Sequence, residues 1–267
     1  MRLVVLGDPV EHSRSPAIHT AALAAVGIEG TYSARRVDDA GMALAVDEVR
    51  YGRITGANVT MPHKRLAFEL ADRTTEGAMR SGAVNTLTRS GGEVWGYNTD
   101  IDGIRAVWAT REFPVDAPVL VLGAGGAAAG ALVALADRSV AISGRRRNAA
   151  ADLLEQTRAG GSVVPWAESL PGAVVVNATP LGMEGESLPE GVMAAASGFF
   201  DLTYASVESP SLRRAREAGL PTADGKDLLL AQAAVSFEIW TGIPAPAAVM
   251  RAAFSSGQIP CSDQRNR

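Results

Sequence analysis

Short apolar runs alternate with alanine-rich helical stretches from one end of this chain to the other. In the first hundred residues the pattern predicts strands at Leu3–Leu6, Gly30–Arg36, Ile54–Asn58, Ala83–Thr88 and Glu93–Tyr97. Helices are expected between these strands, near Pro16–Val26, Asp39–Tyr51 and Lys64–Ala71. This alternation is typical of βα units built around parallel sheets. The first part of the chain is therefore predicted to form an α/β domain.

A second alternation begins at Pro118. A continuous apolar strand is expected at Val119–Leu122, followed at once by a glycine-rich segment and a helix that ends near Ala136. Further strands are expected at Val140–Ser143, Val174–Asn177 and Gly198–Asp201, and a last long helix from about Asp227 to Trp240.

The glycine-rich segment reads Gly123-x-Gly125-x-x-Ala128, which is the spacing of a dinucleotide-binding loop. The first glycine permits a tight turn, the second lets backbone amides approach a pyrophosphate, and the small third residue packs helix on strand. Any tight turn in an alanine-rich chain can imitate the motif, but here it follows an apolar strand and opens a helix, as nucleotide binding requires. The residues expected to bind the cofactor here are Gly123, Ala124, Gly125, Gly126 and Ala127.

Arginines follow the next predicted strand, where NAD enzymes usually carry an acid. The chain reads Ser143-Gly144-Arg145-Arg146-Arg147 and has no carboxylate there. An acid at this position bonds the ribose 2′-hydroxyl of NAD, whereas arginine suits the 2′-phosphate of NADP. The alternative is a solvated basic helix start, but cations are disfavoured at a helix N-terminus unless an anion binds. The sequence therefore predicts NADP(H) as cofactor, with Ser143 as a hydroxyl donor and Arg145 and Arg146 as phosphate ligands.

The first block lacks a phosphate-binding glycine signature, so we expect it to hold the substrate. The predicted fold class is α/β, with an N-terminal α/β substrate domain and a Rossmann-type dinucleotide-binding domain separated by a cleft. Residues 1–102 plus 227–267 are expected to form the substrate-binding and catalytic domain, and residues 103–226 the NADP-binding domain. A length of 267 residues agrees with two domains, since it exceeds the usual size of one.

Composition narrows the class further. The chain is 47% apolar and 20% charged, with a net charge of −4, so a soluble globular protein is expected and no broad basic surface invites nucleic acid. No apolar stretch approaches the ~20 residues that cross a bilayer, which predicts a cytoplasmic protein without a membrane partner. The three histidines are not at metal-ligand spacing, so no metal is expected. The single cysteine, Cys261, lies in the polar tail Ser255–Arg267, which is expected to fray.

Lysine is rare in this chain: only two of its 25 basic residues are lysine. One of them, Lys64, ends the segment Asn58-Val59-Thr60-Met61-Pro62-His63-Lys64, and a second polar segment is Asn98-Thr99-Asp100. A desolvated amine can gain and lose a proton near neutrality, whereas a guanidinium stays charged. A surface charge in a helix's first turn is the alternative, but the surrounding motifs favour a catalytic role for Lys64.

Neutral polar side chains lie near several predicted strand ends, and one of them, Asn85, interrupts the predicted strand Ala83–Thr88. They occur in Ser13-x-Ser15-Pro16, Asn58-Val59-Thr60, Asn85-Thr86 and Asn177-Ala178-Thr179. A helix cap explains any one of them about as well as a site does. Together they supply the donors and acceptors that a polyhydroxylated ligand needs, at the sheet edge where open α/β folds bind ligands.

In these motifs the chain resembles the shikimate dehydrogenase family over essentially its full length. The segments that carry the resemblance are Gly7–Pro16, Asn58–Lys64, Gly82–Thr86, Asn98–Asp100, Gly123–Ala128, Asn177–Met183 and Gly225–Gln232, followed by Phe237 and Trp240. The resemblance implies reversible reduction of 3-dehydroshikimate to shikimate by NADPH. The sequence departs from the family at Gly144-Arg145-Arg146, where Asn-Arg-Thr is usual. The strictness of its preference for NADP over NAD is therefore open.

The resemblance also implies roles for individual residues. Lys64 and Asp100 match the catalytic pair. The residues implied to bind substrate are Ser13, Ser15, Asn58, Thr60, Asn85, Tyr204 and Gln232. Those implied to bind cofactor, besides the glycine segment and the arginine run, are Glu76, Thr179, Leu202 and Gly225. A homodimer is a further expectation.

Other functions fit the same scaffold. A quinate or aminoshikimate dehydrogenase is the nearest alternative, but both Ser13 and Ser15 are present, and the arginine run opposes NAD, which quinate enzymes of this family often use. A non-catalytic ligand-sensing regulator is the other. It is disfavoured because Lys64 and Asp100 are intact and no DNA-binding segment is appended.

Overall fold

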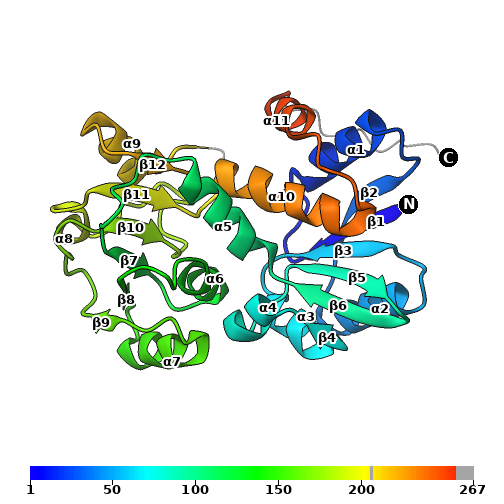
Figure 1. The fold of residues 1–267 in the computed structure, drawn as a ribbon, viewed down its shortest axis with the longest axis horizontal. Coiled ribbons are helices and arrows are strands. Elements are labelled where there is room, and N and C mark those ends of the chain that lie inside the picture. Colours follow the sequence, from blue (N-terminus) through cyan, green and yellow to red (C-terminus); the bar gives the residue numbers. More distant parts are fainter. Residues whose placement is uncertain (205–206, 257–267) are drawn as a thin grey trace. The chain divides into compact units, whose positions relative to one another are not determined.

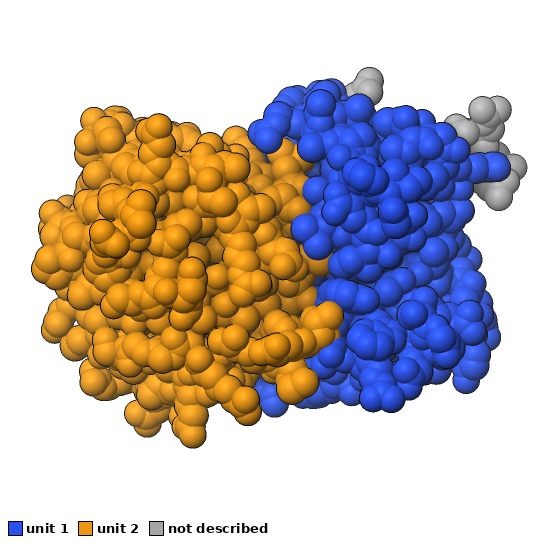
Figure 2. All heavy atoms as spheres, viewed as in Figure 1, with its two compact units in different colours: residues 1–74, 84–97, 233–267 blue, residues 75–83, 98–232 orange. Residues whose placement is uncertain are grey.

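The computed structural model describes residues 1–204 and 207–256 (Figure 1). The chain divides into two compact units (Figure 2): unit 1 contains Met1–Thr74, Val84–Tyr97 and Ala233–Arg267, and unit 2 contains Thr75–Ala83 and Asn98–Gln232. Cys261 and most of the polar tail lie outside the described residues. The predicted α/β class with a substrate-binding and a Rossmann-type part is confirmed. The division of function at residues 102 and 227 stays a prediction.

Unit 1 is built on a mixed sheet. Its strands are β1 (Arg2–Gly7), β2 (Thr31–Arg36), β3 (Gly56–Val59), β4 (Arg73–Thr74), β5 (Thr86–Ser90) and β6 (Glu93–Tyr97), in the order β2-β1-β3-β5-β6-β4. β1 is parallel to β2 and β3, but β5 is antiparallel to β3 and β6, so the expectation of a parallel sheet is wrong here. β5 and β6 are antiparallel because the two-residue turn Gly91-Gly92 joins them, with both glycines at positive φ, 60° and 89°, in a tight hairpin.

Helices cover the two faces of this sheet (Figure 1). α1 (Ser15–Ala25) packs against α11 (Ala247–Ser255) and against β2, whereas α2 (Asp39–Arg50) contacts β5, β6 and α3 (Lys64–Leu70). α10 (Gly225–Thr241) begins in unit 2 and ends in unit 1. Leu3, Ile18, Met42, Leu87 and Phe237 are fully buried in unit 1.

Three aromatic rings cluster inside unit 1. His19 stacks on Tyr32 with ring centroids 4.5 Å apart and planes 8° from parallel, and Trp240 tilts against His19 at 5.3 Å. Trp240 Nε1 donates to the Leu87 carbonyl at 3.0 Å, an approach that depends on Gly56, where a Cβ would lie 2.2 Å from Nε1. Neither ring nitrogen of His19 has a hydrogen-bond partner among the described residues, and burial lowers the pKa of His19 to about 3.

Unit 2 is built on a parallel sheet. Its strands are β7 (Val119–Leu122), β8 (Val140–Ser143), β9 (Ser162–Val164), β10 (Val174–Asn177), β11 (Gly198–Asp201) and β12 (Thr222–Ala223), in the order β12-β11-β10-β7-β8-β9. The predicted bounds of β7, β8, β10 and β11 are confirmed. These strands are continuous apolar runs because both faces are covered: Val119 and Val121 enter one core cluster, and Leu120 and Leu122 enter the other.

The first of these clusters includes residues of α5 (Thr99–Ala109), α6 (Gly126–Ala134) and α7 (Arg147–Thr157). The second includes residues of α8 (Glu190–Met193) and α9 (Pro210–Glu217). α4 (Glu76–Ser81) contacts α6 and α7. Within residues 1–204 and 207–256, no helix combines the length and the hydropathy needed to cross a membrane.

The buried His19 predicts how the stability of unit 1 depends on pH. In the unfolded chain His19 has a pKa near 6.5 and takes up a proton that the folded state, with a pKa of about 3, does not bind. The free energy of unfolding should therefore fall as pH drops from ~6.5 towards 3, by up to ~1.4 kcal/mol per pH unit from this residue alone. Above pH ~6.5 the contribution is constant.

His19→Phe keeps a flat ring beside Tyr32 and removes this titration. Urea unfolding at intervals between pH 7.5 and 4 should show a shallower loss of stability in His19→Phe than in the unmutated protein. The exposed His12 provides the control, because His12→Gln should leave the slope unchanged. Equal slopes in all three proteins would show that folding leaves the pKa of His19 unchanged and would contradict this prediction.

Candidate active site

In unit 1 the loops that follow β1 and β3 are bound to each other. Thr60 N donates to Leu6 O at 2.8 Å, and Asp8 N donates to Met61 O at 3.0 Å. A Cβ at position 7 would lie 2.3 Å from Thr60 Cγ2, so Gly7 is what lets Thr60 lie over the end of β1. This geometry brings Thr60 to the carboxyl edge of the sheet, as expected for a ligand contact.

Lys64 is the first residue of α3 and is partly buried. Its carbonyl accepts from Val84 N at 2.9 Å, which ties the start of α3 to the segment before β5. The preceding residue, His63, is 3% exposed and anchors this turn, because its Nε2 lies 2.8 Å from Val37 O and its Nδ1 lies 3.2 Å from Asp39 Oδ1. The main chain that carries Lys64 is therefore fixed on both sides.

The other expected substrate residues of unit 1 are grouped around neighbouring strand ends. Asn58 on β3 is paired in register with Thr86 on β5, and Asn58 Nδ2 donates to the carbonyl of Asn85 at 3.2 Å. Ser15 is the first residue of α1, and its amide donates to the Ser13 hydroxyl at 3.3 Å, a local bond across the turn that precedes this helix. Asn58 and Asn85 are thus brought together by the sheet itself.

In unit 2 the start of α5 carries Asp100. The preceding Thr99 donates from its hydroxyl to Gln232 Oε1 at 3.3 Å, and Gln232 Nε2 donates to Leu229 O at 3.0 Å. Close packing is possible because Gly103 faces Gln232. A Cβ at position 103 would lie 3.1 Å from the main-chain nitrogen of Gln232. Asp100 and Gln232, expected to act on the same ligand, therefore lie near each other within this unit. Lys64 belongs to unit 1.

The glycine-rich turn between β7 and α6 has the geometry of a nucleotide loop. Gly123 has φ +110°, and a Cβ there would lie 2.9 Å from Ala178 O, so only glycine fits. At Gly125 and Gly126 a Cβ would meet nothing within 4 Å, and both residues are exposed. The first turn of α6 has no side-chain cap and no acidic residue, so its amides are directed at open space.

The arginine run lies beside this loop. β7 and β8 pair in register Leu122↔Ser143, and a Cβ at Gly144 would lie 3.6 Å from the Ala124 Cβ. Arg145, Arg146 and Arg147 are exposed, and within residues 1–204 and 207–256 none of them has an ion pair. Exposed cations beside uncapped helix amides suit an anionic ligand, so these residues fit the phosphates of NADP(H).

Ser143 does not fit its expected role. The residue is fully buried, and its hydroxyl donates to Pro165 O at 3.1 Å. A serine hydroxyl has one proton, and here that proton is used inside the protein. The expectation that the Ser143 side chain donates to a phosphate is therefore corrected. Arg145 and Arg146 remain the expected cationic partners of that phosphate.

A buried pair of polar residues shapes the loops after β10 and β11. Asn177 Nδ2 donates to Asp201 Oδ1 at 3.0 Å, and both residues are 1% exposed. Asn177 Oδ1 accepts from the amide and hydroxyl of Thr179, at 3.1 and 2.6 Å. Asp201 likewise accepts from the amide and hydroxyl of Thr203, at 3.1 and 2.8 Å, and from the Ser209 hydroxyl at 2.6 Å. The pair thus fixes the loops that carry Thr179, Leu202 and Tyr204.

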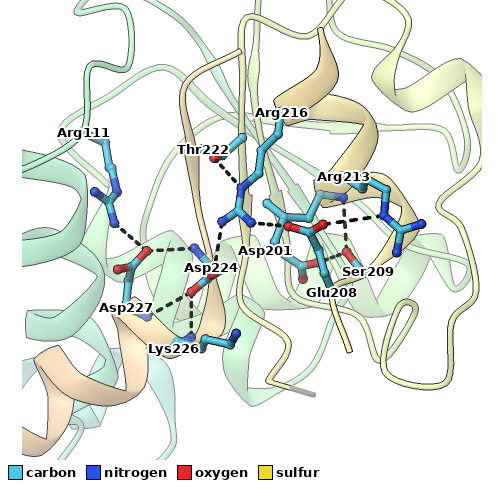
Figure 3. A network of polar contacts seen from close by, with 11 residues as sticks. Arg111, Asp201, Glu208, Ser209, Arg213, Arg216, Thr222, Asp224, Lys226 and Asp227 are labelled. Carbon is cyan, nitrogen blue, oxygen red and sulfur yellow. Dashed lines mark hydrogen bonds and ion pairs between the residues drawn. The ribbon is translucent and has the colours of Figure 1, made fainter. Parts of the chain in front are cut away.

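A second polar network supports the start of α10 (Figure 3). Asp224 Oδ1 accepts from the amides of Lys226 and Asp227, at 2.9 and 3.1 Å, while Asp227 Oδ2 accepts from Asp224 N at 3.2 Å, a reciprocal cap. Arg111 pairs with Asp227 at 2.6 Å. Gly225 lies against the loop after β11, since a Cβ there would be 2.1 Å from Thr203 O. This network brings Gly225 and Tyr204 together.

The remaining expectations are placed as follows. Glu76 is exposed in the first turn of α4, in unit 2. The described residues contain no group of three or more His, Cys, Asp or Glu side chains that could hold a metal ion. Sequence reasoning named Thr86 only as part of a polar motif and did not single out Tyr32 or Ser236; all three surround Asn58. Each occupies an ordinary strand or helix position, so the only available signal was a polar atom at a position predicted to be buried.

Comparison with known proteins supplies the family. The model of the shikimate dehydrogenase substrate binding domain matches residues 5–87, and that of the shikimate 5′-dehydrogenase C-terminal domain matches residues 227–253. A shikimate dehydrogenase (NADP(+)) from Desulforamulus reducens is 37% identical, over 92% of this chain and 92% of the relative. A shikimate 5-dehydrogenase from Thermus thermophilus, solved with NADP(H) and shikimate, has a TM-score of 0.86 at 35% identity, covering 95% of this chain and 98% of that one.

The ligand-free 5-ketofructose reductase of a Gluconobacter strain also has a TM-score of 0.86, at 27% identity, with 96% of this chain and 98% of that chain covered. The fold and the glycine loop define a two-domain α/β protein of the nucleotide-dependent dehydrogenase class. By identity and coverage, the chain belongs to the shikimate dehydrogenase family.

The buried hydroxyl of Ser143 leads to a direct test. Because that hydroxyl is bonded to Pro165 O, Ser143→Ala should change the KM for NADP by less than about twofold. It should lower the free energy of unfolding by roughly 0.5–1.5 kcal/mol, since one buried hydrogen bond is lost. Steady-state kinetics and urea unfolding measure the two effects. A rise in KM for NADP without loss of stability would restore Ser143 as a phosphate ligand.

Proposed function

We propose that this chain catalyses the reversible NADPH-dependent reduction of 3-dehydroshikimate to shikimate. The observation that carries the proposal is the open glycine loop beside three arginines that form no ion pair with any described residue, in a member of the shikimate dehydrogenase family. That combination requires an anionic dinucleotide, and the family supplies the substrate. The lysine and carboxylate at Lys64 and Asp100 supply the proton chemistry that a ketone reduction needs.

NADPH, when bound, supplies the hydride. On this chain, Gly123–Ala127 and the start of α6 would hold the pyrophosphate, because uncapped amides and open backbone are found there. Arg145 and Arg146 would hold the 2′-phosphate through charge-assisted hydrogen bonds. Thr179, Leu202 and Gly225 would contact the remainder of the cofactor, since the Asn177–Asp201 pair and the cap of α10 fix their backbones. Glu76 is the least supported member of this set.

Lys64 would hydrogen-bond the oxygen of the reacting carbonyl and deliver a proton to it as negative charge develops. Asp100 would orient the ammonium group and share its proton. Ser13, Ser15, Asn58, Thr60, Asn85, Tyr204 and Gln232 would bind the hydroxyl groups and the carboxylate of the substrate. We further propose that residues 1–102 plus 227–267 bind the substrate and that residues 103–226 bind the nucleotide. A cytoplasmic location and a homodimer stay predictions.

The substrate is the part of the proposal that most needs measurement, because a 5-ketofructose reductase has the same fold. Initial rates with shikimate and quinate, each with NADP and with NAD, separate the proposed activity from a quinate dehydrogenase. Initial rates with aminoshikimate test the remaining enzyme alternative, an aminoshikimate dehydrogenase. A protein that binds these compounds without turnover would instead be a ligand-sensing regulator.

The role of Lys64 predicts a specific kinetic signature. Lys64→Ala should lower kcat by roughly 10²–10⁴-fold while changing KM far less, because the proton donor acts mainly in the transition state. Arg65→Ala is the matched control, since Arg65 is the next residue on α3 and its side chain is 85% exposed. If Lys64→Ala keeps most of its kcat, Lys64 is a surface charge and has no part in proton transfer.

The arginine run predicts cofactor choice. The protein should prefer NADP over NAD by at least ~100-fold in kcat/KM, about 2.7 kcal/mol, because NAD offers no phosphate to the arginines. Arg145→Ala should remove most of this preference by weakening NADP, with little effect on NAD. Arg214→Ala, an exposed arginine on α9, should leave both cofactors unaffected. Comparable kcat/KM for the two cofactors in the unmutated protein would contradict the assignment and favour a quinate-type enzyme.

A further inference from the structure

A buried polar cluster in unit 1 surrounds the side chain of Asn58. Its members are Tyr32 on β2, the carbonyl of Asn85, Thr86 on β5 and Ser236 on α10. Asn58 is 6% exposed, Tyr32 is 6% exposed, and Thr86 and Ser236 are fully buried. These partners come from three separate segments of the chain, so the cluster exists only in the folded unit.

The partners determine how the Asn58 amide is oriented. Its Nδ2 lies 3.2 Å from Asn85 O, 3.0 Å from Thr86 Oγ1 and 3.1 Å from Ser236 Oγ. A backbone carbonyl only accepts hydrogen bonds, so the atom that faces Asn85 O must be the NH₂ group. Both Nδ2 protons therefore have acceptors inside the protein, and what remains for a ligand is the carbonyl oxygen, Oδ1.

Tyr32 fixes that oxygen. Its hydroxyl donates to Asn58 Oδ1 at 2.6 Å, a short bond that takes the only proton the phenol has. The ring cannot swing away, because His19 stacks on it at 4.5 Å and Trp240 lies against it at 6.1 Å. Burial raises the pKa of Tyr32, so the phenol stays protonated and remains a donor. A hydrogen bond from the Ser15 side chain to the same phenol lowers this pKa, but its effect is smaller than that of burial.

The strand register explains why Tyr32 can reach Asn58. Tyr32 is paired with Leu3 on β1, and Leu3 is paired with Gly56 on β3, two residues before Asn58 on the same face. A tyrosine side chain is long enough to cross β1 and lean along the strand, whereas a shorter side chain at position 32 would end over Leu3. The absence of a side chain at Gly56 leaves room for Trp240 beside the ring.

We propose that Tyr32 is a positioning residue that holds Asn58 with one lone pair of Oδ1 directed to the ligand, so that the substrate hydroxyl bound there must donate a hydrogen bond. The inference rests on the proposed function, in which Asn58 contacts the substrate. It adds a specificity rule, because a group that only accepts hydrogen bonds, such as fluorine or an ether oxygen, would be rejected at this position.

Tyr32→Phe tests the positioning role with the loss of a single oxygen. We expect the KM for shikimate to rise roughly 3–10-fold while kcat stays within about twofold, since the bond orients a binding group and takes no part in proton transfer. Tyr51→Phe is the matched control, because Tyr51 is 68% exposed and should leave both constants unchanged. A thermal unfolding midpoint is measured for each variant. A lowered midpoint with an unchanged KM would make Tyr32 merely structural and overturn the proposal.

A double-mutant cycle shows whether Tyr32 acts through Asn58. Asn58→Ala should itself raise the KM for shikimate, and adding Tyr32→Phe to it should raise the KM no further. Additive effects would mean that Tyr32 acts elsewhere and would overturn the inference. An unchanged KM in Asn58→Ala would instead remove Asn58 from the substrate contacts, and absence of shikimate turnover in the unmutated protein would reject the proposed function itself.

The donor rule is tested first on the unmutated protein, and Asn58→Ala serves as the comparison. Shikimate analogues in which each ring hydroxyl is replaced in turn by fluorine or by hydrogen are used as substrates or inhibitors. At one ring position the fluoro and deoxy analogues should bind with equal affinity, about tenfold weaker than shikimate. In Asn58→Ala, these two analogues and shikimate should bind with similar affinity. If at every position the fluoro analogue binds as well as shikimate, no donor is required and the rule is wrong.

Discussion

Close approach of backbones at the carboxyl edge of each sheet is the constraint on which the candidate site depends. Loops from neighbouring strands must pass within van der Waals contact if their polar groups are to face one ligand, and a Cβ would prevent this at three positions. It would lie 2.3 Å from Thr60 Cγ2 at Gly7, 2.9 Å from Ala178 O at Gly123 and 2.1 Å from Thr203 O at Gly225. Each of these glycines adjoins a residue that we assign to substrate or cofactor. The absence of a side chain at these positions is therefore what allows the loops of the site to approach one another.

Buried amide and carboxylate groups then fix the loops that the glycines bring together. Asp201 accepts from Asn177, Thr203 and Ser209, and Asn58 is bonded on both sides of its amide. A buried polar group is costly unless it is bonded, so each such residue tolerates only one arrangement of its neighbours. Polar residues of the candidate site are in this way oriented before any ligand binds, which would reduce the entropy lost on binding.

The distribution of charge separates structure from recognition. Arg50, Arg216 and Arg111 are paired with carboxylates that lie on other elements or loops. Arg145, Arg146 and Arg147 stand together at the start of α7 without such partners in the part of the chain that the structure describes. Neighbouring cations at a helix N-terminus repel one another and the helix dipole, and a bound phosphate reverses both effects. The basic run is therefore best explained as a binding feature, since its charges repel one another when no phosphate is bound.

The sequence by itself determined the class, the glycine loop and the bounds of β7, β8, β10 and β11, because strands covered on both faces are continuous apolar runs. It misjudged β5, expected at Ala83–Thr88 and found at Thr86–Ser90, because Val84 and Asn85 bond to Lys64 and Tyr97 ahead of that strand. β4 and β12 are two residues long and leave no periodic signal. Only the tertiary structure decided which protons are used internally: Ser143 donates to Pro165, and Tyr32 donates to Asn58. A residue type states how many hydrogen bonds it can make, but the partners come from segments 22 and 26 residues away, and folding alone selects them.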